Sequence, residues 1–331
     1  MATRPERATA DPPRHFLFVL LPGFTLLSFA GAVDALRLAN RMAERTVYRW
    51  SLTGPGGGAA RSSCGAEIAV GGDLPETARD DTLVIVSGVE VRAATTRPVL
   101  AWLRREARRG VRIAGLCTAS HVLAEAGLLD GRRATIHWEN YDAFAEAFPE
   151  IDLSTSVFTA DGNRLTTAGG TSSIDLFLRL VASDHGEGLA SLVADQLIYS
   201  SIRTDRDSQR LSIPTRIGVR HPRLSSVIRR MEQNIEEPIS PSILAAEVGL
   251  STRQLERLFR RYLSRSPKRY YMELRLGRAR NLLMQTDMTI INVALASGFS
   301  SPSHFSKCYR AQYGITPYRE KGTQGAPDGE S

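Results

Sequence analysis

The sequence predicts two domains of different fold class. An α/β three-layer sandwich is expected over residues 15–202, and an all-α domain with a double helix-turn-helix is expected over residues 223–320. Three observations support this division: strand and helix patterns alternate in the first half, a helix-turn-helix pattern occurs twice near the C-terminus, and positive charge is concentrated around that repeat. A chain of 331 residues is long enough for each domain to bury its own core.

The N-terminal half alternates apolar runs with amphipathic segments. Residues 15–22 form a continuous apolar run, which is typical of a strand buried on both faces. Further strands are expected at 48–53, 82–87 and 111–116, and helices at 26–42, 99–109, 118–129, 172–183 and 189–201. This alternation predicts a parallel sheet covered by helices.

Ligands of such sheets bind beyond the carboxyl ends of the strands. The candidate ligand-binding residues therefore follow the expected strands: Gly23, Phe24, Gly88, Val89, Cys117, Thr118, His137 and Trp138. Cys117 stands at a strand-to-helix turn, where a helix N-terminus favours a thiolate or a bound anion. The alternative is a small apolar side chain packed in a tight turn.

Trp138 offers an aromatic face to a cationic amine, a contact of about 0.5–2 kcal/mol, although simple core packing is an equal alternative. A carboxylate at the helix N-terminus and an amine at Trp138 together favour an amino acid, betaine or carnitine-like inducer. The Gly169-Gly170 turn is a weaker candidate for an anion, because it lacks a phosphate-binding frame.

Nucleophilic catalysis by Cys117 needs a base within hydrogen-bond reach. His121 points elsewhere on a regular helix, and His137 follows the next apolar run, so we assign no catalytic residue. Two alternatives stay open beside a sensor: a Cys117-dependent hydrolase tethered to DNA, and a domain that only dimerises.

The first helix-turn-helix pattern covers residues 244–259. Gly249 breaks the first helix, and Ser251 with Gln254 forms a capping box for the second. Four residues line one apolar face of that helix: Leu255, Leu258, Phe259 and Tyr262. The opposite face carries three arginines and can lie in a DNA major groove.

The pattern repeats from Val293, with Gly298 as the turn, Ser301 as N-cap and Pro302 as the first helical residue. In this register Phe305, Cys308 and Tyr309 form the apolar face, and Cys308 is expected in the core. The expected DNA-binding residues are Arg253, Gln254, Glu256, Arg257, Arg260, Ser303, His304, Lys307 and Arg310. A helix over 268–284, roughly 26 Å long, would help set the two recognition helices about 34 Å apart, one turn of B-DNA.

Charge supports the same partner, double-stranded DNA. Residues 216–331 carry 19 Lys and Arg against 10 Asp and Glu, whereas residues 1–215 carry 23 against 25. The overall net charge of +7 therefore comes from the segment with the repeated motif, as phosphate binding requires.

The remaining segments are polar. We expect a linker at 203–222 and disordered tails at 1–14 and 321–331. The sequence has neither a signal-peptide pattern nor an apolar stretch of about 20 residues, which predicts a cytoplasmic protein with no membrane contact. Cys64, Cys117 and Cys308 have no disulfide or metal-ligand spacing, and we expect no metal and no cofactor.

Residues 224–320 resemble the AraC-type DNA-binding domain, including the Gly-Phe-Ser-Ser and His-Phe-Ser-Lys runs of the second motif. Residues 15–190 resemble a class I glutamine amidotransferase-like domain of the PfpI type, through Leu21-Pro-Gly-Phe24, the run 115–121 and the run 126–138. The pairing resembles the GlxA subgroup of regulators.

The resemblance implies a flavodoxin-like fold for the first domain. It also implies a transcription regulator, usually an activator, of the kind that often controls nitrogen or quaternary-amine catabolism. We further expect a homodimer that binds an operator and contacts RNA polymerase. PfpI-type enzymes place His directly after the nucleophilic Cys. Thr118 holds that position here, so the catalytic dyad is not carried over.

Overall fold

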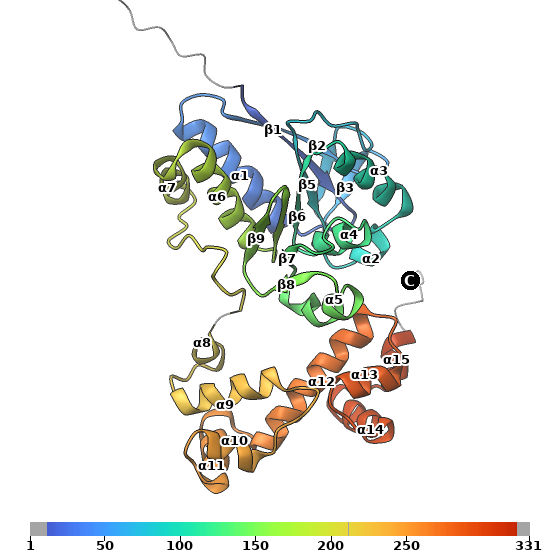
Figure 1. Cartoon of the computed structure of the whole chain (residues 1–331), viewed down its shortest axis with the longest axis vertical. Helices are drawn as coiled ribbons and strands as arrows, with labels where there is room; N and C mark the ends of the chain where they lie inside the picture. Colours follow the sequence, from blue (N-terminus) through green and yellow to red (C-terminus); the bar gives the residue numbers. More distant parts are fainter. Residues whose placement is uncertain (1–11, 211, 323–331) are drawn as a thin grey trace, which may run out of the picture. The chain divides into compact units, whose positions relative to one another are not determined.

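The computed structural model describes residues 12–210 and 212–322 (Figure 1). Most of both predicted tails therefore lies outside the described residues. Where the tail predictions overlap the description they are wrong, because Arg14 begins a strand, and Lys321 and Gly322 end a helix.

A six-stranded sheet forms the centre of the N-terminal part, in the order β2-β1-β5-β6-β10-β9. Its strands are β1 (Arg14–Leu20), β2 (Tyr48–Thr53), β5 (Thr82–Val86), β6 (Arg112–Leu116), β9 (Phe158–Asp161) and β10 (Arg164–Thr167). Every pairing is parallel except β9 with β10. The predicted parallel sheet is confirmed, with one antiparallel edge strand.

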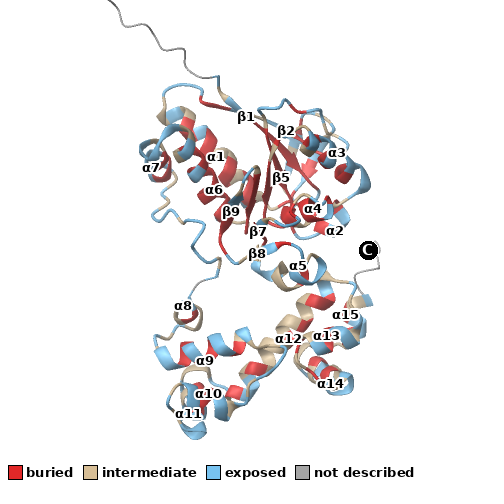
Figure 2. Ribbon diagram, viewed as in Figure 1, coloured by how far each residue is buried: buried red, intermediate tan, exposed pale blue. Residues whose placement is uncertain are grey.

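Helices cover both faces of the sheet (Figures 1 and 2). Alternate residues of β1 enter opposite cores: Phe16 and Phe18 pack with α1 (Leu26–Met42), α6 (Ser172–His185) and α7 (Glu187–Gln196). Leu17 and Val19 pack with α2 (Val91–Ala94), α3 (Arg97–Arg108) and α4 (Ala119–Glu125). The result is the predicted flavodoxin-like three-layer sandwich.

Smaller elements extend this unit: β3 (Gly58–Arg61) with β4 (Glu67–Val70), β7 (Arg133–Thr135) with β8 (Asp152–Ser154), the 3-10 helix η1 (Trp138–Asn140) and α5 (Tyr141–Ala147). The helix expected at 118–129 ends earlier, at Glu125. Gly127 follows with φ +71°, the left-handed conformation that commonly ends a helix.

The C-terminal part is all helical, as predicted. Its helices are α8 (Ile213–Ile217), α9 (Pro222–Gln233), α10 (Pro241–Glu247), α11 (Thr252–Leu263), α12 (Pro267–Gln285), α13 (Ile290–Ala296), α14 (Pro302–Tyr313) and α15 (Pro317–Gly322). The long helix α12 lies between the α10–α11 pair and the α13–α14 pair (Figure 1). None of the helices in the described ranges is long and apolar enough to cross a membrane.

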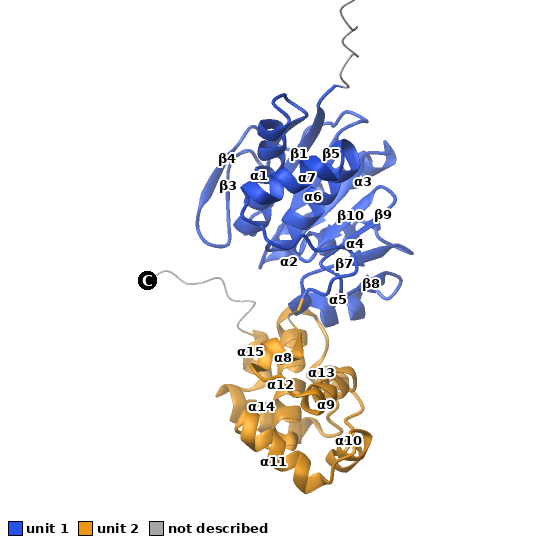
Figure 3. Cartoon of the chain, turned by 90° about the vertical axis from the view of Figure 1, so that its left-hand side faces the viewer, with its two compact units in different colours: residues 1–209 blue, residues 210–331 orange. Residues whose placement is uncertain are grey.

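The chain divides into two compact units, residues 1–209 and 210–331 (Figure 3). Most of the segment predicted as a linker is folded into one unit or the other. Arg203 and Gln209 bond to the first unit, and Ile213 is buried in the core of the second. The polar composition of 203–210 misled the prediction, because its side chains form hydrogen bonds with the sandwich.

Candidate DNA interface and ligand site

The first motif is formed by α10 and α11, with Gly249 in the left-handed conformation (φ +66°) between them. The predicted capping box is present: Gln254 N donates to Ser251 Oγ at 3.2 Å, and Ser251 N donates to Gln254 Oε1 at 2.8 Å. Leu255 and Phe259 are fully buried, which turns the opposite face of α11 to solvent.

In the second motif, α13 starts 49 residues after α10 and α14 starts 50 residues after α11, because the second turn has one extra residue. Gly298 forms the turn (φ +77°), and Ser301 Oγ accepts from His304 N at 3.3 Å. Phe305 and Tyr309 are fully buried at the positions of Leu255 and Phe259. Both recognition helices are therefore docked by matching apolar faces.

The exposed faces of α11 and α14 carry cationic side chains that form no ion pair within the described residues. Within residues 12–210 and 212–322, five predicted DNA-binding side chains form no ion pair: Arg253, Arg257, Arg260, Lys307 and Arg310. The arginines of α12 behave differently, since Arg269 pairs with Glu273 at 2.8 Å and Arg280 with Glu320 at 2.9 Å. The unpaired guanidinium and ammonium groups are available to an external anion.

Four other candidates on these helices differ in availability. Glu256 and Ser303 are exposed. Gln254 is also exposed, but its Oε1 is held by the capping box, which leaves its amide nitrogen as the outward group. His304 Nε2 lies 3.3 Å from Cys308 Sγ, and its ring lies 5.9 Å from that of Phe299.

The prediction of a core role for Cys308 is wrong, because this side chain is only half-buried. It occupies the edge of the docking face, in contact with His304, and the buried positions of α14 are Phe305 and Tyr309.

Contacts across α12 join the two motifs. Arg275 donates to Ser297 O at 3.0 Å and Gly298 O at 2.6 Å, and its guanidinium lies 4.1 Å above the Phe299 ring. Arg278 donates to Glu236 Oε1 at 2.7 Å, in the loop that precedes α10. The 19 residues of α12 thus span about 28 Å between the two motifs. The motifs also touch each other through the loop that precedes α10.

In the N-terminal unit, six of the candidate ligand residues follow the carboxyl ends of β1, β5 and β6, whereas His137 and Trp138 follow β7. Phe24 forms a bridge with Gly88, and Thr118 Oγ1 donates to Gly88 O at 2.6 Å. Cys117 has φ +63°, the left-handed conformation of an elbow residue. Thr25 Oγ1 donates to Cys117 Sγ at 3.5 Å.

This edge is closed over the thiol. Cys117, Thr118 and Phe24 are all buried, and the Phe24 ring packs against Phe29 in the core. The turn at Gly169 covers the elbow so closely that a Cβ there would lie 2.6 Å from Cys117 Sγ. Burial raises the pKa of the Cys117 thiol, which opposes the thiolate expected at this turn.

The anion site expected at Gly169-Gly170 is also wrong. The amide of Gly169 donates to Thr167 Oγ1 at 3.2 Å, and that of Gly170 donates to Ser28 Oγ at 2.9 Å. Both donors are therefore satisfied within the protein.

The outer part of the predicted site is accessible. Val89 is 80% exposed and Trp138 is 42% exposed, so Trp138 is not a core residue. His137 Nδ1 accepts from Glu139 N at 3.4 Å, and burial lowers the pKa of His137. The negative charge of Glu139 contributes to the raised pKa of Cys117. The carboxylate of Glu139 thus lies close enough to the elbow to act on its thiol.

The elbow has no histidine base among the described residues. Within the residues that the structure describes, the thiol of Cys117 has Thr25 as its hydrogen-bond partner and neither histidine. His121 Nε2 lies 3.5 Å from Glu125 Oε1 on its own helix, and its ring packs against Phe148.

Sequence reasoning missed Thr25 and Gly169 as parts of this site. Thr25 follows the candidates Gly23 and Phe24 at the end of β1, so its position was a usable signal. Gly169 reaches the elbow only because β10 lies beside β6 in the sheet, and no local pattern indicates that.

Two helix-turn-helix motifs with unpaired cations on their recognition helices, joined to an α/β domain, define a DNA-binding regulator. Comparisons with known proteins give the same result. Residues 14–183 match the DJ-1/PfpI family, and residues 244–321 match a helix-turn-helix domain.

The chain is 45% identical to the HTH-type transcriptional regulator CdhR of Pseudomonas aeruginosa, over 93% of this chain and 91% of that protein. It is 37% identical to the HTH-type transcriptional regulator GlxA of Rhizobium meliloti, over 91% of this chain and 93% of that protein. The crystal structure of an AraC family transcriptional regulator from Pseudomonas putida covers 56% of this chain and all of its own, with a TM-score of 0.52 and 30% identity. The chain belongs to the AraC family of transcriptional regulators, in the GlxA-like group that carries a DJ-1/PfpI domain.

Proposed function

We propose that this protein is a ligand-responsive transcription regulator whose helices α11 and α14 enter adjacent major-groove segments of one operator. The observation that carries this proposal is the pair of solvent-facing helices, in identical register, whose arginines and lysine have no carboxylate partner in the described chain. Arg253 and Arg257 are proposed to contact bases. Arg260 and Arg310 are proposed to contact phosphates and to act independently of sequence.

The test is operator selection from a random duplex library by the full chain, followed by anisotropy titrations of Arg257→Ala. Loss of a base contact is expected to weaken operator binding by about 1–3 kcal/mol and to relax base preference at one position. Arg229→Ala is the matched control, because Arg229 is an exposed arginine on α9. Unchanged affinity and base preference in Arg257→Ala would rule out this assignment of α11.

We further propose that the N-terminal unit senses a small amine or amino-acid-like metabolite at the sheet edge around Gly23 and Gly88, with the aromatic ring of Trp138 as a contact for the amine. Support comes from the half-exposed ring of Trp138, which is followed in the chain by the exposed Glu139; an aromatic face and a carboxylate each suit a cationic nitrogen. A thermal-shift screen of the full chain against amino acids and quaternary amines tests the idea. A true inducer stabilises the folded state by about 2.7 kcal/mol at 100 times its Kd.

The control for this screen is an exposed aromatic residue far along the chain. Trp138→Ala is expected to abolish the stabilisation, whereas Tyr318→Ala, at a residue that is 78% exposed, should retain it. Stabilisation that survives Trp138→Ala would remove Trp138 from the site.

The protein is proposed to act without catalysis. Support comes from the buried thiol of Cys117, which has no histidine as a hydrogen-bond partner within the described residues, and from relatives that are named regulators. The competing hypothesis is a Cys117-dependent hydrolase, and it predicts turnover of a small amide that Cys117→Ala abolishes.

We also propose a homodimer that activates transcription through RNA polymerase, as the resemblance implies. Exposed apolar side chains support self-association, since Leu192 on α7 and Ile198 just after it are 50% and 92% exposed. Sedimentation of the full chain tests the dimer, with Leu192→Glu expected to produce monomers. In vitro transcription from the selected operator tests the direction of regulation.

A further inference from the structure

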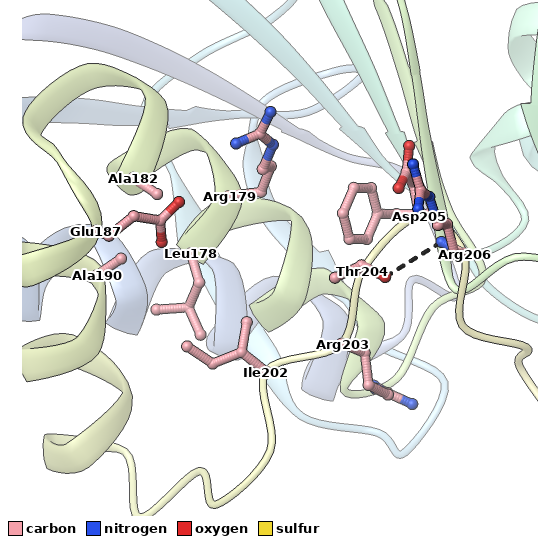
Figure 4. A pocket seen from close by; sticks show the side chains of 11 residues that line it. Leu178, Arg179, Ala182, Glu187, Ala190, Ile202, Arg203, Thr204, Asp205 and Arg206 are labelled. Carbon is pink, nitrogen blue, oxygen red and sulfur yellow. Dashed lines mark hydrogen bonds between the residues drawn. The ribbon is translucent and has the colours of Figure 1, made fainter.

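A cavity lies in the N-terminal unit, and Cys117 is not among its lining residues. It has a volume of about 420 Å³ and is bounded by β9, α6, α7 and the segment 202–206 (Figure 4). Small-molecule pockets usually fall between about 300 and 1,000 Å³. The candidate site at Trp138 shares none of its lining residues.

The wall of this pocket is apolar. It is made by Phe158 on β9, Leu178 and Ala182 on α6, Ala190 on α7, and Ile202. Phe158, Leu178 and Ala190 are buried and belong to the core of the sandwich, whereas Ile202 is 42% exposed. A ligand in this pocket would therefore place an apolar body against an already ordered surface.

The rim of the pocket carries both signs of charge. Glu187, at the start of α7, lies on one side, and Asp205 and Arg206 lie on the other (Figure 4). Arg179 of α6 adds a second guanidinium. Within the described ranges, none of these four side chains has a hydrogen-bond or ion-pair partner; Arg206 donates only through its backbone N, to Thr204 Oγ1.

The segment that closes the pocket is fixed at both ends. Arg203 donates to the buried carboxylate of Asp175 at 2.6 Å and to Thr171 Oγ1 at 2.8 Å. Gln209 Nε2 donates to Ile136 O at 2.9 Å. The pocket wall is thus a preformed part of the unit, because the charge of Arg203 is already neutralised by Asp175 and its rotamer is held.

We propose that this pocket is a binding site for a small zwitterion with an apolar body, separate from the candidate site at Trp138. The cationic nitrogen of the ligand faces the Glu187 carboxylate. Its carboxylate faces the guanidinium groups of Arg206 and Arg179, whose two positive charges exceed the single negative charge of Asp205. Its carbon chain lies against Leu178 and Ile202. A ligand with only one charge would leave the opposite side of the rim without a partner.

The experiment uses the full chain and calorimetric titration with L-leucine and L-phenylalanine as probes. L-leucinamide, which lacks the carboxylate, and 4-methylpentanoate, which lacks the amine, serve as single-charge analogues. We expect saturable binding of at least one amino acid, and binding at least tenfold weaker for both analogues of leucine.

Three variants locate the binding. Glu187→Gln and Arg206→Gln change exposed side chains, so the fold should persist, and each is expected to weaken the amino acid about tenfold. Ala182→Phe fills the pocket and should abolish binding. Asp195→Asn on α7 and Arg49→Gln on β2 are the matched controls, since both residues are exposed and neither lines the pocket.

Absence of binding by both amino acids at about 10 mM overturns the proposal, because a Kd above this concentration corresponds to less than about 3 kcal/mol of binding free energy. Equal binding of the single-charge analogues also overturns it, as does binding that Glu187→Gln and Ala182→Phe leave intact. Binding that is lost in Trp138→Ala but kept in the pocket variants would contradict this site and support the sensing site of the proposed function. The two proposals therefore fail separately.

Discussion

The two helix-turn-helix motifs of this protein share one register but differ in what supports their turns. In the first motif, a Cβ on Gly249 would meet nothing within 4 Å. In the second, a Cβ on Gly298 would lie 2.3 Å from Ile235 O and 2.9 Å from the Pro238 ring. The turn of the first motif thus has space around its glycine. The turn of the second motif is packed against the backbone of the loop that precedes α10.

The two recognition helices also differ, both in their exposed charge and in how they are anchored. α11 presents Arg253, Arg257 and Arg260 to solvent, whereas α14 presents Lys307 and Arg310 and keeps His304 in contact with Cys308. Tyr309 of α14 donates to the buried carboxylate of Glu320 at 2.9 Å, and the equivalent residue of α11 is Phe259. The first motif therefore presents the more cationic face to solvent, and the second motif is the more firmly anchored in its domain.

The largest expected effect comes from the turn glycines. Gly298→Ala combines a left-handed backbone with a clash against Ile235 O, and should destabilise the second motif by about 3 kcal/mol or more. Gly249→Ala carries only the cost of the left-handed backbone, and should destabilise the first motif by about 1–2 kcal/mol. Hydrogen exchange of the full chain, followed over α10–α14, measures both. Equal losses of amide protection in the two variants would mean that the close packing around Gly298 adds nothing to the cost of the substitution.

The second-largest effect is expected from substitutions on the exposed faces of α11 and α14. Arg257→Ala should cost about 1–3 kcal/mol of operator binding, because a guanidinium can pair with guanine through two hydrogen bonds. Lys307→Ala removes a point charge and should cost about 1 kcal/mol or less. Anisotropy titrations at several salt concentrations separate base from phosphate contacts. A larger loss in Lys307→Ala would reverse the proposed roles of the motifs.

A smaller effect is expected at the buried hydroxyl. Burial and the Glu320 carboxylate raise the pKa of Tyr309, so this hydroxyl stays a protonated donor. Tyr309→Phe should destabilise the second motif by about 1–2 kcal/mol, because Glu320 then keeps Arg280 as a partner but loses one donor. Protection of α14 and α15 amides reports the loss. Unchanged protection would show that water replaces the hydroxyl without penalty.

The helix caps give the smallest difference. Ser251→Ala should cost about 1 kcal/mol, and Ser301→Ala somewhat less, because Pro302 already fixes the first residue of α14 in a helical conformation. Exchange of the first-turn amides of α11 and α14 checks this order. A larger loss at Ser301 would indicate that Pro302 does not preorganise that turn.

Local periodicity was enough to place four of the six strands of the central sheet, the docking faces and the two recognition helices. A 3.6-residue repeat fixes which side of a helix is apolar, so the register of Leu255 with Phe305 followed from the sequence. The charge asymmetry identified the same segment without any structural information. The position of Cys117 at an elbow also followed, since a strand pattern passes directly into a helix pattern there.

Tertiary structure alone decided which of those residues are available. Cys117 is covered by Gly169, which follows a neighbouring strand, and Gly298 has no room for a side chain because the loop at Ile235 packs on it. The segment 203–209 has the composition of a linker, yet Asp175 and Ile136 hold it to the sandwich and create the pocket beneath it. Such contacts join residues far apart in the chain, and the sequence pattern within a single element carries no information about them.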